Sequence, residues 1–179
     1  CMKHIWDKDL LEKVAEAKSN KYWKATGVEI DSRKIKKGDL FCALSGSYND
    51  GHHFIKEAID NGAAACLISK KDYCETNTKF ALVKNVTIAL EKMAEEARKR
   101  SKANFIAITG SVGKTGTKEI IKKGLSSVEN TYANEASYNN HIGVPLSLTR
   151  VPSSARYCIL EIGMNKKGEI RELSKFKKP

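Results

Sequence analysis

A short glycine-containing segment constrains the fold of this chain more than any other feature. Thr109–Thr115 reads TGSVGKT. The apolar run Asn104–Thr109 leads directly into this segment, and a lysine-rich helical stretch follows it. The apolar run predicts a buried strand, so the segment has the strand–loop–helix context of a phosphate-binding loop. Further predicted strands alternate with predicted helices along the chain, which indicates an α/β fold with a mostly parallel sheet.

The residues of this loop suit the binding of a nucleotide phosphate. Gly110 and Gly113 let the backbone turn tightly, and the freed N–H groups and the helix start favour an anion. Lys114 can reach the β- and γ-phosphates, and the Thr115 hydroxyl can be a Mg²⁺ ligand. The loop is shorter than the general pattern GxxxxGK[ST], because Ile108 stands at the position of its first glycine; a plain turn before a helix is the alternative. The predicted ATP-binding residues are Thr109, Gly110, Ser111, Val112, Gly113, Lys114, Thr115 and Gly116.

Glu161 lies near the end of a second predicted buried strand, Tyr157–Ile162. A carboxylate at the end of a core strand is costly unless it is paired or bound to a metal. Strand ends in α/β folds line the ligand crevice, so we expect Glu161 to be a Mg²⁺ ligand opposite Thr115. The alternative is a charge at the strand end that reaches solvent.

The segments before residue 101 predict a smaller α/β unit. Predicted helices are Asp7–Ala17, His52–Asn61 and Val86–Arg100, and predicted strands are Val28–Ile30, Asp39–Leu44, Ala63–Ile68 and Phe80–Val83. Asp7 is a plausible N-cap of the first helix, and Gly62 would end the second. We therefore place one unit at residues 1–100 and a second at residues 101–179, the latter with a further helix at Gly168–Phe176.

The charge of the chain is strongly positive, at +11 with a pI near 9.4. Lysine is spread along the whole chain and no basic stretch is interleaved with aromatic residues, so we do not expect nucleic-acid binding. Small polyanionic substrates explain the excess equally well. No apolar run reaches the length of a membrane span, and the first ten residues hold no apolar signal-peptide region. We expect a cytoplasmic protein.

Cysteines and histidines give no sign of a metal site. The five cysteines form no CxxC pair, and the four histidines show no metal-binding spacing. Cys42, Cys66 and Cys158 lie inside apolar runs and are predicted to be buried free thiols.

Five ordered blocks of the sequence resemble the Mur ligase family. Three blocks are similar to its central ATP-binding domain: TGSVGKTGTKE (Thr109–Glu119), SYNNHIGVPLSL (Ser137–Leu148) and LEIGMNKKGEIREL (Leu160–Leu173). Two more are similar to its N-terminal domain for the UDP-sugar substrate: DSRKIKKGDLFCALSG (Asp31–Gly46) and NDGHHFIKEAIDNGAAACLIS (Asn49–Ser69). The resemblance covers nearly the whole chain from residue 27 onward, and the three later blocks fit best the members that add D-Ala-D-Ala.

The resemblance implies an ATP-dependent amide-bond ligase of peptidoglycan precursor synthesis. Its partners would be ATP, Mg²⁺, UDP-N-acetylmuramoyl-tripeptide and D-Ala-D-Ala. Lys114 at the γ-phosphoryl group and Glu161 would be the catalytic residues, with Thr115 and Glu161 as Mg²⁺ ligands. The substrate-binding residues that it implies are Ser32, Arg33, Gly46, Asp50, Gly51, His52, Asn139 and Asn140. The planar guanidinium of Arg33 suits a diphosphate; a surface ion pair is the alternative for Arg33, and a plain turn for Asp50-Gly51.

Two departures from the family bear on activity. Gly116 stands where the family more often has a second threonine. The family also continues well past a position like Pro179, with a later histidine, a modified lysine, adenine contacts and a C-terminal domain. We therefore expect an N-terminal part that is inactive by itself, of a full-length protein that is a monomer. The alternatives are a non-catalytic UDP-sugar or nucleotide-binding module, the family member that adds the third amino acid, and a phosphate-loop NTPase of another class, which leaves the DSR and DGH blocks unexplained.

Overall fold

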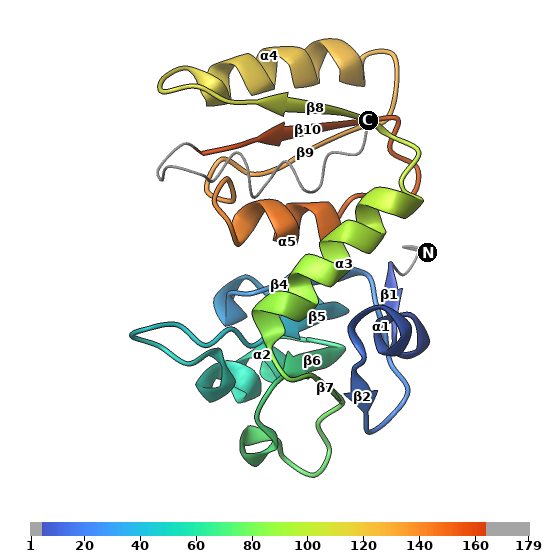
Figure 1. Cartoon of the computed structure of the whole chain (residues 1–179), viewed down its shortest axis with the longest axis vertical. Coiled ribbons are helices and arrows are strands. Elements are labelled where there is room, and N and C mark those ends of the chain that lie inside the picture. Colours follow the sequence, from blue (N-terminus) through green and yellow to red (C-terminus); the bar gives the residue numbers. More distant parts are fainter. Residues whose placement is uncertain (1–4, 164–179) are drawn as a thin grey trace. The chain divides into compact units, whose positions relative to one another are not determined.

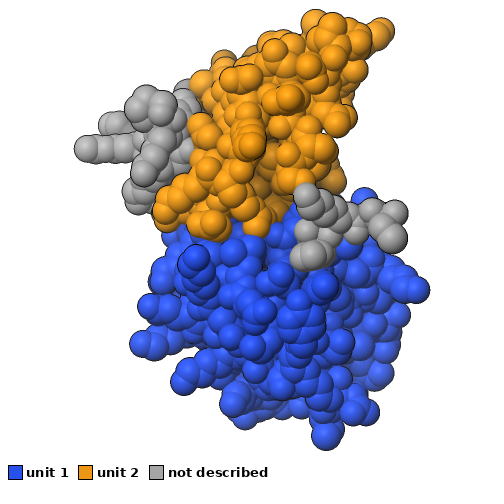
Figure 2. Space-filling view, turned by 90° about the vertical axis from the view of Figure 1, so that its right-hand side faces the viewer, with its two compact units in different colours: residues 1–93 blue, residues 94–179 orange. Residues whose placement is uncertain are grey.

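The chain divides into two compact units, residues 1–93 and residues 94–179 (Figure 2). The structure is a computed structural model that describes residues 5–163. The division falls within helix α3 (Val86–Arg100), a little before the predicted boundary at residue 100. Each unit contains a mostly parallel sheet with helices, which confirms the predicted α/β class.

The first unit is built on a five-stranded sheet with the order β2-β7-β6-β5-β4. Its strands are β2 (Lys18–Ser19), β4 (Gly27–Glu29), β5 (Asp39–Cys42), β6 (Ala65–Ile68) and β7 (Phe80–Leu82). All neighbours are parallel except β2, which pairs antiparallel with β7. Every residue of β5 and β6 is buried, as expected for the central strands of a parallel sheet. A separate antiparallel pair joins β1 (Trp6–Asp7) to β3 (Lys24–Ala25).

The helices of this unit begin and end near the predicted positions. Helix α1 (Lys8–Ala15) has the predicted N-cap, because a carboxylate oxygen of Asp7 accepts the Leu10 N–H at 2.9 Å. The helix predicted at His52–Asn61 is divided into a 3-10 turn, η2 (Gly51–Phe54), and helix α2 (Ile55–Asp60). Gly62 follows α2 with a φ of +104°, which agrees with its predicted role at the helix end. Two further 3-10 turns are η1 (Ser32–Lys34) and η3 (Lys71–Tyr73).

The second unit has a three-stranded parallel sheet with the order β8-β10-β9. Its strands are β8 (Asn104–Ile108), β9 (Thr131–Ala133) and β10 (Tyr157–Glu161). Helices α4 (Lys114–Ser126) and α5 (Gly143–Thr149) lie on opposite faces of this sheet (Figure 1). Because side chains alternate along a strand, Cys158 and Leu160 pack with residues of α5, while Glu161 points to the face that α4 covers.

The sequence prediction for β8 is wrong in one respect. We expected a buried strand, yet Ile108 is its single buried residue, and Asn104 and Ala107 are exposed. The physical reason is its position: within the described residues β8 pairs only with β10 and is an edge strand. The helix predicted at Gly168–Phe176 lies outside the described residues. Among residues 5–163, each helix is too short or too polar to cross a membrane.

A half-buried aspartate, Asp50, connects the loop after β5 to the end of β6. Oδ1 of Asp50 accepts the backbone N–H of His52 at 3.0 Å and pairs with Nδ1 of the His52 ring at 2.6 Å, and its Oδ2 accepts from the Lys70 ammonium at 2.7 Å. The ring Nε2 of His52 in turn accepts the Ser69 N–H at 2.9 Å. Burial by itself would raise the pKa of the Asp50 carboxyl, but the hydrogen bonds from Lys70 and His52 outweigh it and hold the pKa well below its usual value.

The network makes a prediction about stability and pH. Asp50→Asn should lower the free energy of unfolding by about 1–3 kcal/mol at neutral pH, because a hydrogen-bonded charge is lost. Since the pKa of Asp50 is lower in the folded state, its stabilisation is complete above the unfolded-chain value of about 4 and is lost as pH falls toward the folded value. Urea unfolding at a series of pH values should show the unchanged chain and the variant converging in acid. Asp72→Asn, at an exposed site, is the control; a constant difference at every pH would contradict the assignment.

Candidate functional site

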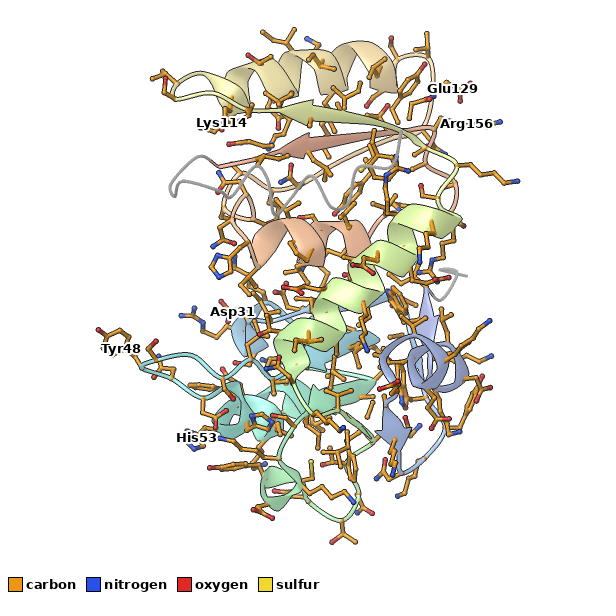
Figure 3. The ribbon with its side chains drawn as sticks, viewed as in Figure 1. Asp31, Tyr48, His53, Lys114, Glu129 and Arg156 are labelled. Atoms are coloured by element: carbon orange, nitrogen blue, oxygen red, sulfur yellow. The ribbon has the colours of Figure 1, made fainter. Side chains whose placement is uncertain are left out.

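The glycine loop lies at the carboxyl end of β8, where parallel sheets bind their ligands. Gly110 and Gly113 have φ values of +152° and +80°, a region that favours glycine, so the backbone turns where the sequence predicted. Lys114 begins α4, and its ammonium donates to the Gly110 carbonyl oxygen at 2.6 Å (Figure 3). The first N–H groups of a helix have no partner within the helix. The loop therefore offers an anion both backbone donors and a cation.

The remaining predicted loop residues leave this surface open. All of them are exposed to solvent, and Val112 is 89% exposed. These residues are Thr109, Ser111, Val112, Thr115 and Gly116.

Glu161 faces the start of α4. The register pairs it with Ile108, directly before the glycine loop, so the ends of two neighbouring strands bring the carboxylate to the loop. The Thr115 hydroxyl lies 3.2 Å from each of the two carboxylate oxygens. Glu161 is only 2% exposed, so the alternative of a strand-end charge in solvent is wrong. The two predicted metal ligands are therefore adjacent.

Two residues that the sequence analysis did not select complete the surroundings of Glu161. The Lys118 ammonium lies 3.2 Å from its Oε2 and donates to the Asn134 carbonyl oxygen at 2.8 Å. The Asn134 side chain accepts the Glu161 N–H at 2.7 Å and donates to its carbonyl oxygen at 2.9 Å. One signal was available in the sequence: Lys118 comes three residues after Thr115 on a helix, and this spacing places both on one face.

The adjacent asparagines Asn139 and Asn140 have different positions. The Asn139 amide nitrogen is 3.4 Å from Oε1 of Glu161, so this side chain faces the carboxylate. The Asn140 side-chain oxygen accepts the N–H groups of Ile142 at 3.1 Å and Gly143 at 2.7 Å. Asn140 therefore holds the start of α5, and of the two only Asn139 approaches Glu161.

The predicted substrate residues of the first unit gather at the carboxyl ends of β4 and β5. The Arg33 side chain is 79% exposed and forms two contacts with the Asp31 carboxylate, at 2.9 and 2.8 Å. This guanidinium holds the pKa of Asp31 below its usual value. The ion pair that we considered as the alternative is thus present, and the exposed guanidinium keeps a face open to solvent. Ser32 is buried, and its hydroxyl donates to the Glu57 carboxylate at 2.7 Å.

The loop after β5 carries the other predicted residues. The Gly46 N–H donates to the Asn49 carbonyl oxygen at 2.9 Å, and Tyr48 projects from the loop at 98% exposure (Figure 3). Gly51 begins η2, directly after Asp50. His52 is buried, with both ring nitrogens bonded inside the protein. His52 therefore fixes the loop, and a direct contact of its ring with a ligand would break one of these bonds.

The three buried cysteines within residues 5–163 are not suited to act as nucleophiles. Cys42, Cys66 and Cys158 are buried free thiols, as predicted. Burial raises the pKa of Cys66 and of Cys158 to about 12. Since the thiolate is the reactive form, these thiols are inert at neutral pH.

The donors beside the glycine loop fit Mg²⁺ in their chemistry. Thr115 and Glu161 supply hard oxygen atoms, and Mg²⁺ commonly binds one or two carboxylates together with substrate phosphates. Within residues 5–163, no cluster of three or more His, Cys, Asp or Glu side chains is arranged to hold a metal ion. A Mg²⁺ ion held by Thr115 and Glu161 would take its further ligands from nucleotide phosphates and water.

Family models match two adjoining stretches of the chain. The model for the Mur ligase family catalytic domain matches residues 24–109. The model for the Mur ligase middle domain matches residues 108–179.

Curated relatives carry the name UDP-N-acetylmuramoyl-tripeptide–D-alanyl-D-alanine ligase. The Rickettsia prowazekii protein is 46% identical over 152 residues, which is 85% of this chain and 34% of the relative. The Bacillus subtilis protein is 34% identical over 176 residues, 96% of this chain and 38% of the relative. The chain thus spans about a third of the length of these relatives.

Solved structures give the same result. A UDP-N-acetylmuramoylalanyl-D-glutamyl-2,6-diaminopimelate–D-alanyl-D-alanyl ligase from Acinetobacter baumannii superposes with a TM-score of 0.83 at 28% identity, covering 97% of this chain and 40% of that one. The MurF ligase from Thermotoga maritima in complex with ADP has a TM-score of 0.67 at 31% identity, over 86% of this chain and 35% of that one. Sequence, structure and the two adjoining family models therefore agree that the chain belongs to the Mur ligase family.

Proposed function

We propose that this chain is the N-terminal part of an ATP-dependent ligase that joins D-Ala-D-Ala to UDP-N-acetylmuramoyl-tripeptide in the cytoplasm. The observation that carries the proposal is the glycine loop with Lys114, placed beside the Thr115 hydroxyl and the buried carboxylate of Glu161. The names of the relatives support the substrates, since these relatives cover most of this chain at up to 46% identity. The first unit would bind the UDP-sugar end of the substrate, and the second unit the nucleotide.

The reaction needs positioning and neutralisation of charge more than it needs a reactive side chain. A carboxylate oxygen of the tripeptide attacks the γ-phosphorus of ATP, and ADP leaves. The amine of D-Ala-D-Ala then attacks the acyl carbon, phosphate leaves with the bonding electrons, and the nitrogen releases a proton to phosphate or solvent. The first step develops negative charge on phosphoryl oxygens, and the second develops it on the acyl oxygen and then on the leaving phosphate. Fixed cations and N–H donors stabilise these charges.

The residues of the second unit fit the nucleotide side of this reaction. The N–H groups of the glycine loop and the start of α4 would hold the phosphates, and Lys114 would turn from the Gly110 carbonyl oxygen to the γ-phosphoryl group. Thr115 and Glu161 would hold Mg²⁺, which supplies charge neutralisation between the phosphates when it is bound. Asn139 would border the same space, because its amide faces Glu161.

The residues of the first unit fit an anionic substrate end. Arg33 is exposed at the end of β4, and a guanidinium binds a diphosphate bidentately. The loop that contains Gly46 and Tyr48 lies at the end of the neighbouring strand, and the Asp50 network holds its base. This is the edge of a parallel sheet at which ligands bind.

The nucleotide site is tested by Lys114→Ala in the 179-residue chain. Loss of a charged hydrogen-bond donor should weaken the binding of Mg-ATP by about 10- to 100-fold. Calorimetric titration with Mg-ATP measures the change, and Lys123→Ala, an exposed lysine on the same helix, is the matched control. Equal affinity of the Lys114 variant and the unchanged chain would show that the loop is only structural.

The UDP-sugar site is tested by Arg33→Ala. Calorimetry with UDP-N-acetylmuramoyl-tripeptide should give a dissociation constant about 10-fold higher than that of the unchanged chain, the lower end for a charged contact because Arg33 already pairs with Asp31. Lys36→Ala removes an exposed charge before β5, at the amino edge of the sheet, and should leave binding as it is. A substrate that binds the Arg33 variant with unchanged affinity would exclude Arg33 from the site.

A further inference from the structure

A buried lysine on the helix after the glycine loop has no assigned role. Lys118 is the buried residue of α4, at 2% exposure, on a helix whose other residues are exposed or half-buried. Burial of an ammonium costs several kcal/mol unless partners compensate it. A lysine at the surface would cover the sheet without that cost, so its position inside calls for a specific reason.

One partner of Lys118 is Glu161, the carboxylate of the candidate metal site. Its ammonium contacts Oε2 of Glu161 at 3.2 Å and the carbonyl oxygen of Asn134 at 2.8 Å, and Glu119 is more distant at 3.9 Å. Lys118 thus joins the helix that follows the glycine loop to the ends of β10 and β9.

The two oxygen atoms of Glu161 have different surroundings. Oε2 faces Lys118, and Oε1 faces the Asn139 amide at 3.4 Å, while the Thr115 hydroxyl is 3.2 Å from both. The Glu161 backbone is fixed by Asn134 through its N–H and its carbonyl oxygen. The backbone of Glu161 is therefore fixed, and of its two carboxylate oxygens Oε2 is the one paired with the Lys118 ammonium.

We propose that Lys118 is a positioning residue that occupies Oε2 of Glu161, so that the carboxylate presents Oε1 alone to the divalent cation. This inference rests on the proposed function, in which Glu161 holds Mg²⁺. A carboxylate that presents one oxygen suits the small octahedral Mg²⁺, whereas Ca²⁺ readily takes both oxygens of a carboxylate. Lys118 therefore favours Mg²⁺ over Ca²⁺ at the nucleotide site.

The direction in which cation affinity changes when Lys118 is replaced distinguishes this positioning role from simple neutralisation of the Glu161 charge. Lys118→Met keeps much of the side-chain volume and removes the charge. If Lys118 only neutralised Glu161, its loss would strengthen the binding of both cations, because one repelling charge disappears. If it positions the carboxylate, Mg²⁺ binding becomes weaker and Ca²⁺ binding changes less, because Glu161 can then offer both oxygens.

The experiment measures cation affinity of the 179-residue chain saturated with ADP. Electron paramagnetic resonance measures the concentration of free Mn²⁺. Displacement of bound Mn²⁺ by Mg²⁺ or by Ca²⁺ then gives the affinity for each cation. In Lys118→Met, Mg²⁺ affinity should fall by about 10- to 100-fold, the usual effect of losing a partner of a metal ligand, and the preference for Mg²⁺ over Ca²⁺ should fall with it. Lys123→Met, the matched exposed lysine, should leave both unchanged.

Each contrary result has one meaning. An unaltered preference in Lys118→Met, or stronger binding of both cations, would overturn the positioning role and leave the proposed function intact. Absence of ADP-dependent Mn²⁺ binding by the unchanged chain would overturn the proposed function, and this inference with it.

If circular dichroism shows that Lys118→Met does not fold, a second measurement on the unchanged chain tests the positioning role. The ¹⁵N resonance of the Lys118 ammonium is observed in the unchanged chain with ADP, before and after addition of Mg²⁺. A buried, hydrogen-bonded ammonium beside the metal-binding carboxylate should shift when Mg²⁺ binds. An unmoved resonance at saturating Mg²⁺ would overturn the inference.

Discussion

Parallel strand pairing determines where the chemistry of this chain can lie. Strands that run in one direction end at the same edge, so the loops after them meet there even when they are distant in sequence. In the second unit this brings the glycine loop after β8 beside Glu161 at the end of β10, and beside the segment after β9 that carries Asn139. In the first unit the same rule brings Arg33, the loop after β5 and Lys70 to one edge.

A buried carboxylate is the second constraint, and the surrounding residues follow from it. Glu161 is almost inaccessible to solvent, and a charge in that position needs partners. It has a hydroxyl from Thr115, an ammonium from Lys118 and an amide from Asn139. These partners come from α4 and from the loop after β9, so one charge determines how the helix, the sheet and that loop meet.

Sequence reasoning predicted the parts with a strong local pattern. The strands β5, β6 and β10 are apolar runs, the glycine loop has fixed spacing, and Asp7 and Gly62 have the chemistry of helix ends. Strand β9 and helix α5 were not predicted, because one has three residues and the other is buried on all sides and lacks a polar face. The exposure of β8 and the burial of Lys118 against Glu161 were missed, since both depend on which elements lie beside them. His52 was assigned to the substrate from a motif. Its ring bond to Asp50 is local, but its bond from the Ser69 N–H depends on the position of the end of β6, which no local pattern contains.

Asn134 shows how far a fold can depend on the identity of one residue. Its side-chain amide pairs with both polar groups of the Glu161 backbone, as a peptide unit of a neighbouring strand would do. Main-chain pairing is indifferent to the side chain, so most positions of a strand tolerate many substitutions. Here aspartate would lack the donor and glutamine would be one methylene too long. A designer who rebuilt this strand end would have to retain asparagine directly after Ala133.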